Sequence, residues 1–165
     1  MATGSAERIL MTIERFVDPF ETIDVREAVD IRSQILSLEK EMKKQAQLEI
    51  VPRHYIAHGL YAREITIPKG CLLTGKIHLF EHINIVSKGD ISVLTDTGIK
   101  RIQAPSTFIA SPGIKRVGFA HEETVWTTIH AANITDPEQA EKLLVVDSFE
   151  EYTKALEGGQ CLSLP

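Results

Sequence analysis

The sequence predicts a mainly β protein, in which an antiparallel β-sandwich or barrel lies between two helical segments. Between residues 51 and 133, short β-branched runs alternate with turn signals about every ten residues, a pattern typical of sandwiches and barrels. Helical spacing of apolar residues is found before and after this region. Strands do not alternate with helices, which argues against a dinucleotide-binding α/β sheet. We therefore expect an N-terminal helical arm (1–50), a β-barrel (51–133) and a C-terminal helical tail (134–165).

Composition narrows the class of protein. The 165 residues carry a net charge of −5 and are 43% apolar, enough to bury a core and without the basic surface of a general nucleic-acid binder. Cys71 and Cys161 form no C-x-x-C pair and are expected to be reduced thiols. The sequence has no secretory signal at its start and no apolar run of membrane-spanning length. We expect a cytoplasmic protein without a membrane or nucleic-acid partner.

The N-terminal arm contains one amphipathic helix, predicted over residues 24–45, with Asp24 as its N-cap. Its apolar residues recur at spacings of four, three and four: Ile31, Ile35, Leu38 and Met42. This face either packs on the barrel or pairs with a second copy of the chain. Since closed twofold dimers are the commonest soluble oligomers, we expect a homodimer.

The barrel is expected to consist of six β-rich stretches in sequence. Turn signals of the types Pro-Lys-Gly, Ser-Lys-Gly-Asp, Thr-Asp-Thr-Gly and Ser-Pro-Gly punctuate them. The stretches cover residues 63–70, 76–90, 91–98, 99–113, 114–123 and 124–131.

The C-terminal tail predicts two short helices. Asp136 followed by Pro137 is an N-cap with proline in the first helical position. Ser148 with Glu151 forms a capping box, and Gly158 ends the second helix. Neither helix carries a chemical motif, so both are expected to cover the open face of the barrel or a subunit contact.

Two histidines four residues apart, His78 and His82, are the first candidates for chemistry. If the chain turns near Phe80, the two imidazoles converge from adjacent strands. Two imidazoles make a weak metal site, so a third ligand is required. His130 is the preferred third ligand, because it shares a strand face with Trp126; the alternative is a buried histidine bonded to a backbone carbonyl. The other histidines considered are His54, His58 and His121.

The segment His78-x3-His82-x6-Gly89 resembles the first motif of the cupins, a His-x-His pair followed by a glutamate and a glycine turn. The segment "APSTFIASPGIKR", residues 104–116, resembles the second motif. The resemblance covers residues 55–131 and implies a jelly-roll barrel. It also implies a divalent first-row metal ion as a candidate cofactor, with His78 in the position of the second histidine and His82 in that of the glutamate.

The same alignment places Lys76 and Arg116 in the two remaining ligand positions, where both side chains would point into the barrel. An inward cation is rarely buried without an anion. Either Glu64 or Glu123 neutralises these residues, or the pocket binds a carboxylate or phosphate group. The wider pattern also resembles small cupin-like proteins encoded by tailed bacteriophages, which implies a viral gene and the host cytoplasm.

Three functions therefore stay open. The first is a scaffold or interaction protein with a viral or host partner. The second is a metal-dependent enzyme that acts on a small polar metabolite, with His78, His82 and His130 as metal ligands. The third is a module that binds a small anion through Lys76 and Arg116. One fold can host all three, so the fold does not choose between them.

Overall fold

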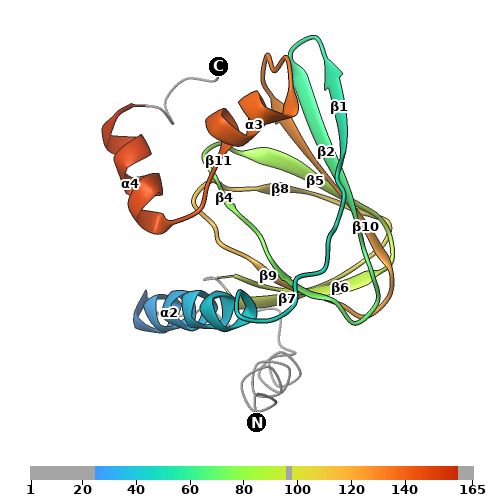
Figure 1. Ribbon diagram of the computed structural model, residues 1–165, viewed down its shortest axis with the longest axis vertical. Coiled ribbons are helices and arrows are strands. Elements are labelled where there is room, and N and C mark those ends of the chain that lie inside the picture. Colours follow the sequence, from blue (N-terminus) through green and yellow to red (C-terminus); the bar gives the residue numbers. More distant parts are fainter. Residues whose placement is uncertain (1–24, 96–97, 160–165) are drawn as a thin grey trace.

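The computed structural model describes residues 25–95 and 98–159 (Figure 1), so that Asp24 and Cys161 lie outside the described residues. The helices are α2 (Val25–Met42), α3 (Pro137–Leu144) and α4 (Phe149–Glu157). The strands are β1 (Arg53–Ala57), β2 (Leu60–Ile67), β3 (Leu72–Thr74), β4 (Ile77–His78), β5 (His82–Lys88), β6 (Asp90–Thr95), β7 (Gly98–Gln103), β8 (Ser106–Ala110), β9 (Val117–Ala120), β10 (Thr124–Ala131) and β11 (Val145–Val146). Among these helices, none is both long and apolar enough to cross a membrane.

Two antiparallel sheets form the barrel. One has the order β1-β2-β10-β5-β8 and the other the order β3-β9-β6-β7, while β4 and β11 form a separate pair. Apart from the β1–β2 and β6–β7 hairpins, successive strands of the two sheets alternate between them. Eight strands in two four-stranded sheets connected in this way are a jelly roll, and β1 extends one sheet at its edge. The predicted fold class, a mainly β antiparallel jelly roll with flanking helices, is confirmed.

The space between the sheets is filled from alternate positions of the strands. Along β5, His82, Asn84 and Val86 are buried, whereas Ile83 is exposed and Ile85 half-buried. This period of two is expected for a strand with one face toward the core. The interior cluster consists of Ile67, Val86, Ile91, Val93, Ile102 and Ala120. The same alternation that packs Val86 in this core turns His82 and Asn84 into the barrel.

Helix α2 packs on the barrel with the face that its sequence predicts. Ile35 and Leu38 are buried against Leu94 and Val117, and α2 lies next to β7 and β9 in Figure 1. A buried ion pair fixes this contact, since Lys115 is 2% exposed and its Nζ lies 2.9 Å from Oε1 of Glu39. The barrel of the same chain therefore covers the apolar face of α2. The homodimer stays a prediction, but the apolar face of α2 is no longer an argument for it.

The C-terminal helices start where the sequence predicts. The side chain of Asp136 accepts a hydrogen bond from the backbone N–H of Gln139, and Ser148 accepts one from Glu151. The Glu151 carboxylate accepts from the backbone of Asp147, one residue before the expected partner in the capping box.

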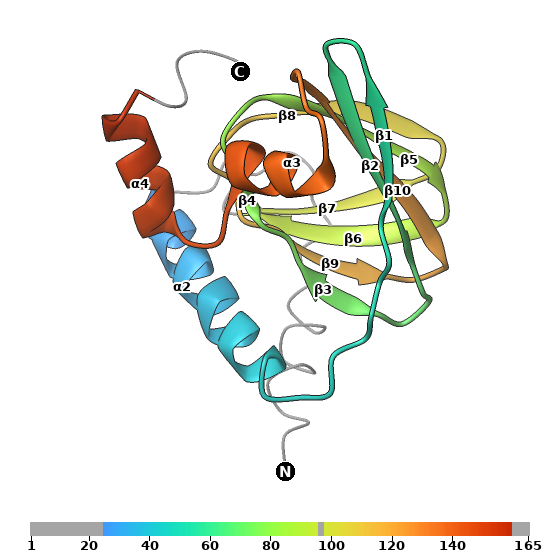
Figure 2. The same cartoon turned by 45° about the horizontal axis from the view of Figure 1, so that its top comes forward.

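These helices close one end of the barrel. Figure 2 shows α3 against the end of the barrel at which β4 lies, and β11 pairs with β4 so that Val145 faces His78. The cap cluster, an apolar group under these helices, consists of Tyr61, Leu79, Phe80, Ala132, Ile134, Ala140, Leu144 and Ala155. Arg32 of α2 lies 4.8 Å from the ring centroid of Phe149, which joins the arm to the tail.

Candidate metal centre and the adjoining cavity

The structure brings together three histidines from three strands. His78 ends β4, His82 begins β5, and His130 lies near the end of β10. The pairing of Ile129 with Ile83 places His130 opposite His82 across neighbouring strands. The short turn between β4 and β5 folds the chain back and sets the ring of His78 beside that of His82. The three side chains thus meet beneath the cap cluster.

The distances within this cluster suit a common metal ion. The ring centroids lie 4.0 Å apart for His78 and His82, 5.1 Å for His78 and His130, and 4.9 Å for His82 and His130. One nitrogen from each ring lies within 4.8 Å of the others. Bonds of about 2.0–2.1 Å from imidazole nitrogen to zinc allow two ligands on one ion to be at most ~4.2 Å apart. Small ring rotations therefore suffice for all three nitrogens to reach one ion.

The hydrogen bonds show which ring nitrogen of His82 is available. Its Nδ1 lies 2.9 Å from the carbonyl oxygen of Phe80. A carbonyl only accepts, so Nδ1 carries the proton and Nε2 carries the lone pair. Nε2 is buried and has no hydrogen-bond partner. A backbone carbonyl that orients a histidine through its other nitrogen is a frequent feature of metal sites.

His130 does not form the bond to a backbone carbonyl that a structural histidine would have. The sequence left open a bond from this ring to a backbone carbonyl, but its Nε2 lies instead 3.0 Å from Nδ1 of His78. Its Nδ1 is buried and without a partner. The ring of His130 is therefore held by another candidate ligand, and it lacks the backbone contact of a structural histidine.

All three imidazoles are neutral near pH 7. Burial lowers the pKa of His82 to about 4 and that of His130 to about 3. Burial also holds the pKa of His78 well below its usual value, and His82, His130, Arg116 and Arg63 lower it further. A metal requires the neutral form of histidine as its ligand, so these low pKa values keep the lone pairs available.

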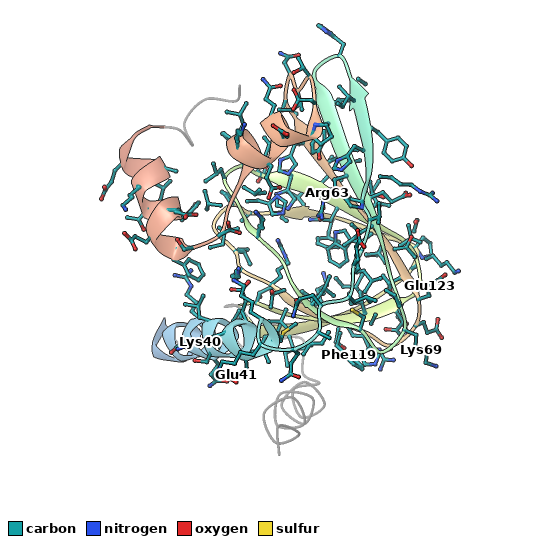
Figure 3. All side chains as sticks on the ribbon, in the orientation of Figure 1. Lys40, Glu41, Arg63, Lys69, Phe119 and Glu123 are labelled. Atoms are coloured by element: carbon teal, nitrogen blue, oxygen red, sulfur yellow. The ribbon has the colours of Figure 1, made fainter. Side chains whose placement is uncertain are left out.

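A cavity of ≈ 100 Å³ lies inside the barrel, and the three histidines do not line it. Its polar lining includes Asn84, which follows His82 by two residues on the same face of β5, and Thr128, which precedes His130 by two residues on β10. Arg63 and Arg116 complete the polar lining. Figure 3 shows Arg63 in the middle of the molecule, away from the end of the barrel at which Lys69 and Glu123 lie. The apolar walls are formed by Ile65, Ile67, Leu73, Ile91, Val93 and Trp126.

Of the two cations predicted to point inward, Arg116 lines the cavity and Lys76 does not. Lys76 is exposed, forms an ion pair with Glu141 of α3, and lies 3.2 Å from Asp147. The prediction of an inward Lys76 is wrong. Lys76 precedes β4, and its side chain turns toward the C-terminal tail, where its two acidic partners lie.

The glutamates that the sequence offered as internal partners lie elsewhere. Glu64 forms an ion pair with Arg53, and Glu123 forms one with Lys88. Neither neutralises Lys76, whose partners come from the tail.

The remaining histidines lie outside the cluster. His54 is exposed, and its Nδ1 lies 2.7 Å from the hydroxyl of Tyr61; His58 is exposed. The hydroxyl of Ser92 lies 2.7 Å from Nε2 of His121. Sequence reasoning passed over Asn84 as a functional residue, although strand alternation from His82 places it on the inner face.

Comparisons with known proteins found similar solved structures only at low identity. No protein-family model matches the chain, and no curated protein matches it. Similar solved structures include an RmlC-like cupin from Shewanella frigidimarina, at 20% identity, 50% coverage of this chain, 82% coverage of that chain and a TM-score of 0.41. A cupin domain from Bordetella pertussis is 14% identical, and the match covers 52% of this chain and 96% of that chain, with a TM-score of 0.42. KdgF from Halomonas sp. is 16% identical, and the match covers 53% of this chain and 84% of that chain, with a TM-score of 0.43.

The strand order defines a jelly roll, and the three histidines give it a candidate metal centre.

Proposed function

We propose that this protein is a metal-dependent enzyme that binds a divalent first-row metal ion through His78, His82 and His130 and acts on a small metabolite in the adjoining cavity. The observation that supports this most is the buried Nε2 of His82, which carries a lone pair and has no partner. A buried acceptor without a partner costs roughly 1–3 kcal/mol, and a bound cation would remove this cost.

The ligand set favours certain metals and leaves room for chemistry. Neutral imidazoles suit zinc, iron, nickel and copper, whereas magnesium and calcium prefer oxygen ligands. Three protein ligands leave a coordination position for water or substrate, as in catalytic zinc sites. A bound ion would supply Lewis-acid activation of that ligand.

The surrounding residues have separate tasks. The carbonyl of Phe80 holds His82 in the tautomer that exposes its lone pair. The cap cluster excludes water on the side of α3. The cavity begins two residues along β5 and β10 from His82 and His130, at Asn84 and Thr128, and provides space for a small molecule.

Metal analysis and thermal melts of the purified protein test this proposal. We expect one first-row metal ion per chain and a lower melting temperature after chelation. A ligand that occupies a site at 100 times its Kd adds about 2.7 kcal/mol, which is on the order of 5–10 °C for a chain of this length. His130→Ala should abolish both metal uptake and the response to chelator. His121→Ala, which removes a histidine outside the cluster, is the matched control and should retain both.

One combination of results would overturn the proposal. If metal neither binds to the wild-type protein nor shifts its melting temperature, and His130→Ala still melts lower, the histidines are structural. The scaffold role, the bacteriophage origin and the cytoplasmic location stay predictions.

A further inference from the structure

One residue in the lining of the cavity has a buried hydrogen-bond donor without an acceptor. Asn84 is 2% exposed, and its Oδ1 accepts from Nε1 of Trp126 at 2.8 Å and from the hydroxyl of Thr128 at 3.1 Å. Because an indole nitrogen only donates, the atom facing Trp126 must be the oxygen of the amide. The amide nitrogen is thereby fixed on the other side, where it is buried and without a partner.

Two arginines lie in the lining around this donor. Arg63 of β2 and Arg116, just before β9, line the same cavity from the two opposite sheets. Among the described residues, its lining includes no aspartate or glutamate. Arg63 pairs with Thr128 in register, and Thr128 pairs with Asn84. Two strand spacings, about 10 Å, therefore separate the backbones of Arg63 and Asn84, which an extended arginine side chain can largely span.

A divalent ion at the cluster would add further positive charge. A negatively charged acceptor for Asn84 is favoured in this surrounding, because it would also attract the guanidinium groups in the lining.

The apolar part of the lining indicates what the rest of the ligand is like. The six apolar side chains form walls that no polar ligand body would complement. A compact anionic head with a short apolar body fits both halves of the lining, as in most small-molecule sites. A planar carboxylate also suits the donors, since arginine forks bind it in bidentate fashion. Free phosphate offers no apolar part for the walls.

We infer that the cavity binds a small carboxylate with an apolar body, whose carboxylate oxygens accept hydrogen bonds from Asn84 and the flanking arginines. This inference names the substrate class of the proposed enzyme and rests on the proposed function only in that respect. Binding of the carboxylate itself uses Asn84, Arg63 and Arg116 and does not require the metal.

Isothermal titration with isovalerate tests the inference on metal-free and metal-loaded protein. Isovaleramide, the neutral isostere, and inorganic phosphate serve as comparison ligands. We expect isovalerate to bind both forms of the protein, isovaleramide to bind at least about tenfold more weakly, and phosphate to bind more weakly than isovalerate. Equal affinities for the acid and the amide, or tighter binding of phosphate, would overturn the inference.

Variants locate the carboxylate. Asn84→Asp keeps the shape of the side chain but replaces the N–H donors by a negative charge, and it should weaken isovalerate binding by at least about tenfold. Arg63→Gln, at an exposed position that the fold does not require, should weaken it several-fold. Arg53→Gln is the matched control, because it removes an exposed arginine that pairs with Glu64 outside the cavity, and it should bind normally. If Arg63→Gln binds isovalerate as tightly as the wild type does, the assigned carboxylate position is wrong.

Metal uptake measured on the same samples separates the two proposals. A protein that takes up metal but not isovalerate overturns the carboxylate inference and leaves the metal centre. A protein that binds isovalerate but no metal supports the carboxylate site and overturns the proposed enzyme.

Discussion

Two buried polar clusters lie at opposite ends of β5, and they differ in whether their hydrogen bonds are complete. Asp90, 8% exposed, follows the far end of this strand, and its carboxylate accepts bonds from Arg101 at 2.9 and 2.8 Å and from Gln103 at 3.1 Å. The histidine cluster at the near end leaves Nε2 of His82 and Nδ1 of His130 without partners. Together with Nδ2 of Asn84, these are the only buried side-chain nitrogens or oxygens without a partner in the described part of the chain.

This difference separates a structural cluster from a candidate site. Both clusters have perturbed pKa values, so a perturbed pKa alone does not distinguish them. Their causes do: the bond from Arg101 is the largest cause that lowers the pKa of Asp90, whereas burial is the largest cause that lowers the pKa values of the histidines. Asp90 already has its counterion within the fold. The histidines are kept neutral, and two of their buried nitrogens have no partner, a state that costs stability.

Acidification should produce the largest effect and should separate the two clusters by pH. The pKa values of His82 and His130 are about 4 and about 3 in the fold and about 6.5 in the unfolded chain, so the unfolded chain binds more protons below pH 6.5. The metal-free protein should therefore lose about 1.4 kcal/mol per pH unit for each histidine as the pH falls below 6.5 toward 4. Urea unfolding at pH 7, 6 and 5 measures this loss.

Asp90 should respond in a different pH range. Its pKa in the fold lies below the usual 3.8, so its stabilising contribution is complete above pH 3.8 and decreases as the pH falls below that value. The variant Asp90→Asn should consequently show the same slope as the wild type between pH 7 and 5. A metal-free wild type with constant stability over this range would contradict the expected cost of the neutral histidines.

Disruption of the Asp90 cluster, whose hydrogen bonds are complete, should have the next largest effect. Asp90→Ala removes charge-assisted hydrogen bonds and should lower the free energy of unfolding by about 2 kcal/mol at pH 7, with or without metal. The cost stays moderate because Arg101 is 58% exposed on its side chain and can be solvated. Glu150→Gln is the control, since its pair with Lys154 lies on the surface and should contribute about 0.5 kcal/mol or less. Chemical denaturation of both variants measures the difference, and equal losses would contradict it.

Local sequence patterns predicted much of the fold and part of the site. The caps at Asp136 and Ser148 and the apolar face of α2 depend on residues close together in the chain, and all three are confirmed. The histidine cluster was accessible because strand alternation placed His130 on the same face as Trp126. The spacing of His78 and His82 around an expected turn near Phe80 supplied its partners, and the cupin resemblance then placed both in ligand positions.

Long-range packing accounts for what sequence reasoning missed. The partners of Lys76 come from the C-terminal tail, and Glu39 meets Lys115 across 76 positions of the chain. No local period encodes such contacts. The role of Asn84 depends on the direction of its amide, which only the bond from Trp126 reveals.

The smallest expected effect is also the sharpest test of the comparison, and it concerns His82 in the metal-free protein. His82→Leu removes a buried acceptor without a partner, which should recover roughly 1–3 kcal/mol, but it also removes the bond to Phe80, at a cost of similar size. The two terms should nearly cancel, leaving a difference within about 1 kcal/mol at pH 7. With excess metal, only the wild type should gain stability, so the same pair of proteins should then differ by about 2.7 kcal/mol at 100 times the Kd. Urea unfolding of both proteins with and without metal measures all four values. If His82→Leu lowers the free energy of unfolding of the metal-free protein by about 3 kcal/mol, His82 stabilises the fold as Asp90 does. The two clusters would then both be structural.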